Sequence, residues 1–314
     1  MAITFFMGLS AIIFIKGALI MKNTVFTGAA TAIVTPMTEA GVDYESFERL
    51  IEWQIEEGID AIVVAGTTGE SSTLSDAEHR EVIRFAVEKI AGRVPVIAGT
   101  GSNDTGYAID LTKYACSIGA DAVLVVTPYY NKATQGGLIK SFTAIADAST
   151  KPIILYSVQS RTGCNIAPET CAELAKHPNI VAIKEASGNI SQIAKIASLV
   201  GDDMDIYSGN DDQILPILSL GGKGVISVLS NIVPKETSKI CSSFFEGNIE
   251  ESRELQLKYI DLIDALFSEV NPIPAKAAVS AMGFGENYLR LPLTPMEDAH
   301  KKVLFDIMKR NGVL

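Results

Sequence analysis

The chain is poor in the residues that build metal centres and disulfide frameworks. Its 314 residues include only three histidines and four cysteines. No two cysteines form a Cys-x-x-Cys pair, and no histidine stands at zinc-ligand spacing from them. So few cysteines do not make a disulfide framework in so long a chain. We therefore expect reduced thiols, a cytoplasmic protein and no metal site.

Positive charge is also scarce, because 26 Lys and Arg face 37 Asp and Glu and leave a net charge of -11. Such a chain lacks the electrostatic footprint for nucleic acid or for an anionic membrane surface, although a local basic site can still bind a small acid. Glycine (25) and proline (12) are at ordinary levels, which excludes collagen-like repeats. The hydrophobic fraction of 47% is ample for a large core.

The first twenty residues differ from the rest. Residues 1–15 are apolar and uncharged, and Lys16 follows them. A signal peptide carries its positive charge before the apolar run, and a membrane helix needs roughly 18 to 20 apolar residues. A weak anchor and an upstream extension with a functional start at Met21 both remain open. We favour the extension, place 1–20 outside the fold, and expect its deletion to leave activity intact.

Eight short apolar runs alternate with amphipathic segments through most of the chain. Continuous apolar runs are typical of parallel strands that are buried on both faces. The predicted strands are 29–35, 61–67, 94–99, 122–127, 152–156, 180–184, 205–209 and 224–228. The predicted helices between them include 44–57, 76–90, 105–118, 135–148 and 168–176. Ser75 and Glu78 form a capping-box pattern at the start of one helix.

Eight strand–helix units predict a (β/α)8 TIM barrel. The rival doubly wound sheet often has a glycine-rich loop after its first strand, whereas here that strand ends in Thr35-Pro36. From residue 234 to 311 only helices are expected. We therefore place an α/β barrel at 21–247 and a C-terminal helical segment at 248–314.

Lys184 is the first candidate for chemistry, because function in such barrels lies at the carboxyl ends of the strands and Lys184 ends the sixth run. Burial lowers the pKa of a lysine and frees its amine to form a Schiff base with a carbonyl substrate. The structural alternative is a lysine paired with a carboxylate at the barrel rim. Alone, that alternative is the commoner, so the assignment depends on neighbouring residues.

Hydroxyl groups arrive at the same end from three other strands. Tyr156 ends the fifth run, Tyr130 follows the fourth, and Thr67 ends the second. Hydroxyls that converge from different strands can relay protons. For each tyrosine the alternative is a packed ring at the barrel rim.

Two features nearby suit a carboxylate ligand. The segment Gly66-Thr-Thr-Gly69 offers backbone N–H groups and the hydroxyl of Thr68. Arg161 follows the fifth strand and can bind a carboxylate through two parallel hydrogen bonds, unless it is a solvated surface residue.

Taken together, these motifs resemble the pyruvate-dependent class I aldolases of the N-acetylneuraminate lyase superfamily, and within it the dihydrodipicolinate synthase family. The resemblance runs from about residue 26 to the C-terminus. Each motif is weak and the ordered set is specific: TAIVTP (31–36), GTTGES (66–71), VIAGTG (96–101), TPYYN (127–131), SRTG (160–163), IKEA (183–186), GVISV (224–228), NPIP (271–274) and LRLP (289–292).

The resemblance implies a role for each candidate. Lys184 would form an imine with pyruvate, while Thr67, Tyr156 and Tyr130 would relay protons, with Tyr130 supplied by the neighbouring subunit of a tight dimer. Thr68 would hold the pyruvate carboxylate. The remaining substrate-binding positions would be Arg161, for the carboxylate of L-aspartate 4-semialdehyde, and the backbone of Gly209 and Ile226.

The same resemblance implies a lyase of lysine (diaminopimelate) biosynthesis that needs no metal or organic cofactor. Members are commonly homotetramers built as dimers of dimers. Two other functions remain open: a related aldolase or dehydratase that acts on a sugar acid, as N-acetylneuraminate lyase or 2-keto-3-deoxygluconate aldolase does, and a non-catalytic barrel that senses a small carboxylate.

The chain departs from the family pattern just before Arg161. The family usually has Asn and Pro where this chain has Ser157 and Gln159. Loss of proline removes a fixed φ and restores a backbone N–H. We therefore expect altered kinetics or a shifted aldehyde preference, and expect the double change Ser157→Asn with Gln159→Pro to raise turnover.

A possible allosteric cleft is suggested by lysine-sensitive relatives. Tyr107 stands where they usually have a glutamate that pairs with the lysine amine, and Asp76 replaces a ring side chain. Losing that charge-assisted bond would weaken lysine binding by roughly 1.5 to 3 kcal/mol, so we expect weak or absent inhibition by lysine. The matching cleft positions are Ser71, Ser72, His79, Asn103 and Tyr129.

Overall fold

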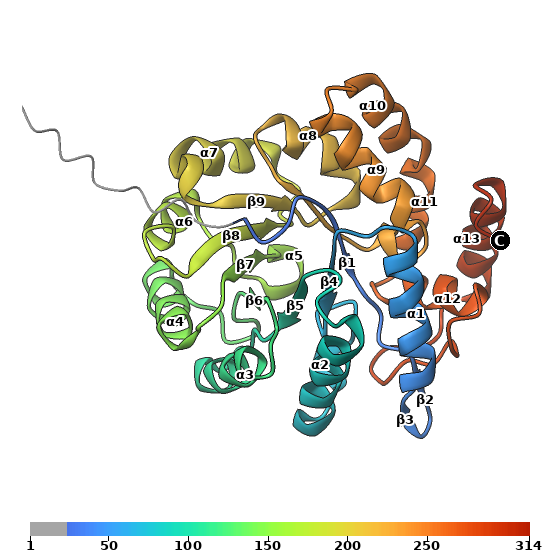
Figure 1. The fold of residues 1–314 in the computed structure, drawn as a ribbon, viewed down its shortest axis with the longest axis horizontal. Coiled ribbons are helices and arrows are strands. Elements are labelled where there is room, and N and C mark those ends of the chain that lie inside the picture. Colours follow the sequence, from blue (N-terminus) through green and yellow to red (C-terminus); the bar gives the residue numbers. More distant parts are fainter. Residues whose placement is uncertain (1–23) are drawn as a thin grey trace, which may run out of the picture.

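The computed structural model describes residues 24–314 and confirms the barrel (Figure 1). Eight parallel strands close on themselves because β1 pairs with both β4 and β10. Every predicted strand is present, with its ends moved by at most a few residues. The strands are β1 (Gly28–Ala32), β4 (Ala61–Val64), β5 (Val96–Gly99), β6 (Ala122–Val126), β7 (Ile153–Ser157), β8 (Ile180–Glu185), β9 (Asp205–Ser208) and β10 (Gly224–Ser227).

Helices cover the outside of the barrel (Figure 1). The capping box predicted at Ser75 is formed, with the Ser75 side chain accepting from the N–H of Glu78. The outer helices are α1 (Tyr44–Glu56), α2 (Asp76–Ile90), α3 (Thr105–Ser117), α4 (Gln135–Ala148), α6 (Pro168–Leu174), α7 (Ile190–Val200), α8 (Ile214–Ser219) and α9 (Pro234–Phe245).

The C-terminal segment is helical and packs against α1, where the Trp53 and Phe284 rings lie 5.1 Å apart. Its helices are α10 (Ile249–Lys258), α11 (Ile260–Leu266), α12 (Ile273–Ala281) and α13 (Asp298–Arg310). Sequence patterns did not predict the small hairpin of β2 (Met37–Thr38) and β3 (Gly41–Val42), or the short helix α5 (Gln159–Thr162). No helix within residues 24–314 is long and apolar enough to span a bilayer. The expectation for 1–20 lies outside the described residues.

The interior of the barrel is filled at its amino end by an aromatic pair. Phe26 and Tyr207 stack with their ring centroids 4.2 Å apart, and the Tyr207 hydroxyl donates to the Phe26 carbonyl at 2.6 Å. Ile97 and Ile226 belong to the same buried cluster. This packing leaves the carboxyl ends of the strands as the place where polar side chains can reach a ligand.

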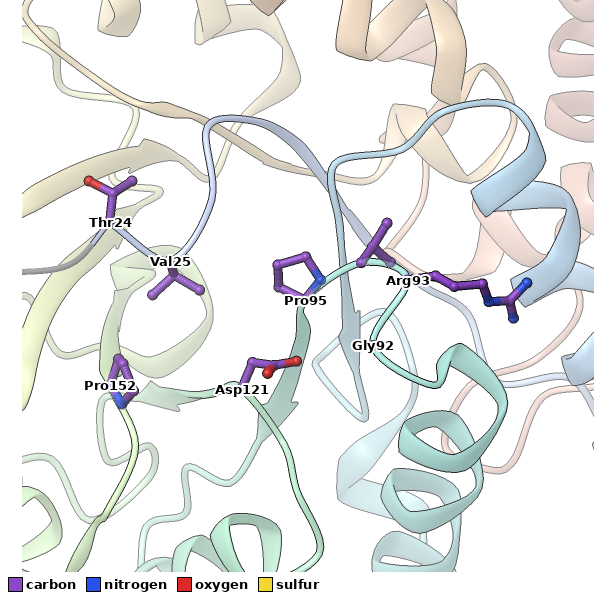
Figure 2. A pocket seen from close by; sticks show the side chains of 8 residues that line it. Thr24, Val25, Gly92, Arg93, Pro95, Asp121 and Pro152 are labelled. Atoms are coloured by element: carbon purple, nitrogen blue, oxygen red, sulfur yellow. The ribbon is translucent and has the colours of Figure 1, made fainter.

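A cavity of about 330 Å³ lies at the amino ends of the strands (Figure 2). Its walls come from turn residues that precede strands, among them Pro95, Asp121 and Pro152. The Asp121 carboxylate accepts from the N–H of Val96 at 2.8 Å. These side chains fix strand starts and include none of the predicted catalytic residues.

Candidate active site

Lys184 lies near the carboxyl end of β8 with only 5% of its side chain exposed. Burial lowers its pKa to about 7, with a further lowering by the charge of Arg161, and the buried carboxylate of Asp211 opposes the shift. A large fraction of the amine is therefore neutral near pH 7. This is the protonation state that a nucleophile needs.

Tyr156 lies directly beside Lys184, because the two residues are register partners on β7 and β8. The Lys184 Nζ is 4.4 Å from the centroid of the Tyr156 ring. Burial raises the pKa of Tyr156, while the charge of Arg161 and a side-chain hydrogen bond from Thr67 lower it. The structure thus brings Lys184, Tyr156 and Thr67 together, as the sequence predicted.

Gly209 and Ile226 were expected to line the site through their backbones, and that role stays a prediction. A methyl group on Gly209 would stand 2.6 Å from the Cβ of Ala186 and 3.1 Å from the Cε of Lys184, so only glycine fits there. Ile226 is fully buried on β10. Gly209 follows β9, the strand next to β8 on the side away from Tyr156, and Ile226 lies on β10, one strand further around the barrel.

Thr67 and Arg161 line a cavity of about 370 Å³ at this end of the barrel. Lys184 and Tyr156 do not line it themselves. The cavity reaches them through Thr67, which hydrogen-bonds to Tyr156. Arg161 is exposed and affects the pKa of both Lys184 and Tyr156 through its charge. The cavity wall thus offers a guanidinium and several hydroxyl groups, which suit a small acid.

Tyr130 is not brought to the other catalytic candidates within one chain. It is 92% exposed and its backbone is left-handed, with φ at 69°. An unusual backbone conformation that presents a ring to solvent suits a residue that acts outside its own chain. Its predicted role across a dimer interface stays a prediction.

The cavity also contains most of the predicted lysine-binding positions. Its lining includes Ser71, Ser72, His79, Tyr107 and Tyr129. Asn103 is not in that lining, and its carbonyl accepts from Asn131.

The Tyr107 hydroxyl already has a hydrogen-bond partner within the chain. Its hydroxyl donates to Asp76 at 3.0 Å, and Asp76 also bonds to Arg80 at 2.9 Å. Burial and then the hydrogen bond to Asp76 raise the pKa of Tyr107 to about 12, so the side chain is neutral. A lysine amine would find the Asp76 charge already paired. Weak inhibition by lysine stays our prediction.

The unusual Ser157 points away from the catalytic side chains. It is fully buried, and its hydroxyl donates to the Asn165 side chain at 3.3 Å and accepts from the N–H of Ile166 at 3.3 Å. Asn165 in turn bonds to Gln192, which donates to the Glu185 carboxylate at 3.4 Å. The Ser157 side chain is therefore connected to the end of β8 through this network. The predicted gain from Ser157→Asn with Gln159→Pro stays a prediction.

Sequence reasoning missed two buried polar residues near the site. Asp211 follows β9, and its carboxylate accepts from the N–H groups of Val228 and Leu229 at 3.0 and 2.9 Å. Asn271, in the C-terminal segment, donates to Thr68 at 3.0 Å. The position of Asp211 two residues after Gly209 was an available signal, whereas the contact of Asn271 had none in its local pattern.

Metal-capable side chains gather at one other place within residues 24–314. Glu269, Glu297 and His300 have ligand atoms within 4.8 Å of one another. The His300 Nδ1 lies 2.8 Å from Glu269, so a side-chain hydrogen bond between α13 and the turn that joins α11 to α12 accounts for the contact. None of the three is among the predicted catalytic residues.

Comparison with known proteins agrees with this geometry. The profile of the Dihydrodipicolinate synthetase family matches residues 25–311. The chain is 58% identical over 292 residues to 4-hydroxy-tetrahydrodipicolinate synthase of Lachnoclostridium phytofermentans, and 55% identical over 289 residues to the enzyme of that name from Alkaliphilus oremlandii. Each match covers 92% of this chain and 99% or 100% of the relative.

A solved structure gives the same result in three dimensions. Dihydrodipicolinate synthase from Acinetobacter baumannii, in complex with pyruvate, is 44% identical and superposes with a TM-score of 0.90. The match covers 93% of this chain and 100% of that one. The family match and the full-length relatives together show that this chain belongs to the dihydrodipicolinate synthetase family.

Proposed function

We propose that this chain catalyses the 4-hydroxy-tetrahydrodipicolinate synthase reaction, the condensation of pyruvate with L-aspartate 4-semialdehyde in lysine biosynthesis. The observation that carries the proposal is the buried Lys184 amine, with its pKa lowered to about 7, beside Tyr156 and Thr67. Family membership and full-length relatives of that name support it.

The chemistry begins at the neutral amine of Lys184. It attacks the C2 carbonyl of pyruvate, and loss of water leaves a protonated imine, which serves as the electron sink without a metal or organic cofactor. Removal of a proton from C3 gives an enamine that attacks the aldehyde carbon. The amino group of the adduct then displaces Lys184 and closes a six-membered ring.

Tyr156 and Thr67 carry protons in these steps, because their hydroxyls are bonded to each other and Tyr156 lies against the lysine amine. Thr68 binds the pyruvate carboxylate. Arg161, exposed on the cavity wall, binds the carboxylate of the semialdehyde.

A homotetramer arranged as a dimer of dimers completes the site. Its support is Tyr130, a relay candidate that is 92% exposed in the single chain. A cytoplasmic location is part of the proposal, and its support is the likeness to 4-hydroxy-tetrahydrodipicolinate synthases.

The test is a coupled assay with pyruvate and aspartate semialdehyde that follows reduction of the cyclic product by its downstream reductase. Turnover with these substrates supports the proposal. Pyruvate trapped on Lys184 by borohydride without turnover would contradict the semialdehyde as acceptor and favour a sugar-acid aldehyde. Absence of both trapping and turnover would favour a sensor.

A further inference from the structure

The turn that carries Thr67 and Thr68 adopts a backbone that needs outside support. Two non-glycine residues that flank it, Ala65 and Glu70, have φ of 52° and 55°. L-residues rarely adopt this left-handed conformation, and it persists where surrounding contacts enforce it. On the β1 side, Thr35 donates to the carbonyl of Gly69 at 2.8 Å. This bond holds only one edge of the turn.

Besides hydrogen bonds within the turn, further restraints come from the C-terminal segment, about two hundred residues later in the chain. Lys276 on α12 forms an ion pair with Glu70, and both side chains are almost completely buried. The N–H of Arg290 donates to the second oxygen of the same carboxylate at 3.2 Å. Because a buried ion pair tolerates little displacement, it fixes the end of the turn that follows Thr68.

Asn271 reaches the turn at Thr68 itself. Its amide Nδ2 donates to the Thr68 Oγ1 at 3.0 Å, and both residues are buried, with 5% and 3% exposed. The Asn271 Oδ1 has no partner within residues 24–314. The bond to Thr68 therefore sets where this amide lies.

The role of the Thr68 hydroxyl in this hydrogen bond determines what it can still bind. A threonine hydroxyl has one proton to donate and can accept two. Thr68 accepts from Asn271, and nothing in the described chain accepts its proton. The O–H is thus turned away from the amide, and its proton has no acceptor within residues 24–314.

We propose that Asn271 is a positioning residue of the pyruvate site: it holds the Thr68 hydroxyl so that its proton is presented to the substrate carboxylate. The Glu70–Lys276 ion pair anchors the turn on which Thr68 is carried. The inference rests on the proposed function, and it makes the C-terminal segment part of the substrate-binding machinery.

The test compares Asn271→Ala with the wild-type chain in the full-length protein. We expect the KM for pyruvate to rise roughly tenfold, as for loss of one hydrogen bond to a bound ligand, with the KM for aspartate semialdehyde unchanged. The pyruvate concentration that half-saturates borohydride trapping on Lys184 should rise by the same factor. Asn311→Ala is the matched control, since the Asn311 amide bonds only to its own helix end, at Ile307.

A double-mutant cycle separates positioning from general structural support. In a Thr68→Val background, Asn271→Ala should add little to the KM for pyruvate, because the group it orients is already gone. Asn271→Asp provides a second variant of the same shape, in case alanine weakens folding. It replaces the donor with an acceptor that captures the Thr68 proton, and the KM for pyruvate should again rise.

Two results would overturn the inference. One is an unchanged half-saturating pyruvate concentration in both Asn271→Ala and Asn271→Asp. The other is full additivity with Thr68→Val, which would mean that Asn271 acts by another route. If the wild-type protein traps no pyruvate on Lys184, the proposed function is wrong and the inference fails with it. This outcome is distinguishable from the other two, because the wild-type protein is measured before any variant.

Discussion

The two ends of the barrel use their polar side chains differently. At the amino end, the half-buried Asp60 accepts from the N–H of Ala29 at 2.8 Å, and the exposed Asp121 accepts from that of Val96 at 2.8 Å. At the carboxyl end, Glu185, Asp211 and Asn271 each keep one side-chain oxygen that is buried without a partner within the described residues. The carboxylates at the amino end accept from N–H groups at the starts of strands. The three residues at the carboxyl end each have an oxygen that can still accept a hydrogen bond.

We infer from this difference that polar groups at the amino end contribute to stability and those at the carboxyl end to catalysis. A buried polar atom left without a partner costs about 1–3 kcal/mol, so a fold retains such atoms where they do something else. Burial also acts on Lys184 at this end, because it disfavours the charge of the amine and thereby provides a nucleophile. Substitutions at the carboxyl end should therefore alter kinetics, and those at the amino end should alter stability alone.

The largest effect should come from Tyr156→Phe, which keeps the ring beside Lys184 and removes the hydroxyl bonded to Thr67. We expect kcat to fall by about 10²–10⁴-fold, the usual contribution of a positioned acid–base group. The free energy of unfolding should change little. Steady-state kinetics and thermal unfolding of the same preparation check both parts, and a variant with near-normal kcat would remove Tyr156 from the relay.

The next largest effect should come from Lys276→Met, and it should be on stability. Lys276 holds the turn that carries Thr67 and Thr68 and is not itself a catalytic candidate, so it sharpens the comparison. Removing one partner leaves the buried carboxylate of Glu70 unpaired, at a cost of about 3–5 kcal/mol. Denaturant unfolding measures it. The double variant Lys276→Met with Glu70→Gln should recover much of the loss, and a double variant no more stable than the single one would contradict this assignment.

The pH dependence of imine formation should be smaller but diagnostic. The folded pKa of Lys184 is lowered to about 7, so the neutral amine is about half populated there and falls about tenfold for each pH unit below. The rate of pyruvate trapping should rise with pH and level off above about 7 to 8. A rate that keeps rising to pH 10 would mean that the amine has an ordinary lysine pKa.

The smallest kinetic effect should come from Asp60→Ala at the amino end. It leaves the N–H of Ala29 without its acceptor and should destabilise the fold by about 1–3 kcal/mol. Both KM values and kcat should match those of the wild-type chain. A large loss of activity at undiminished stability would break the division between the two ends.

The sequence predicted the barrel because its signals are local. Each strand is a continuous apolar run, and Lys184, Tyr156 and Thr67 stand at the ends of such runs, so their convergence followed from the topology alone. The bond from Asn271 to Thr68 spans 203 positions and depends on how the C-terminal helices pack. The pairing of Tyr107 with Asp76 likewise joins the first turns of two helices, α3 and α2, and no spacing rule reveals it.

The most direct test is borohydride reduction in the presence of pyruvate, with the modified residue located by mass spectrometry in the wild-type chain and in Lys184→Ala. We expect one pyruvate adduct, on Lys184 of the wild-type chain, and none in the variant, together with loss of turnover in the coupled assay. An adduct on another lysine, or turnover that survives in Lys184→Ala, would contradict the central claim that the buried amine of β8 is the nucleophile.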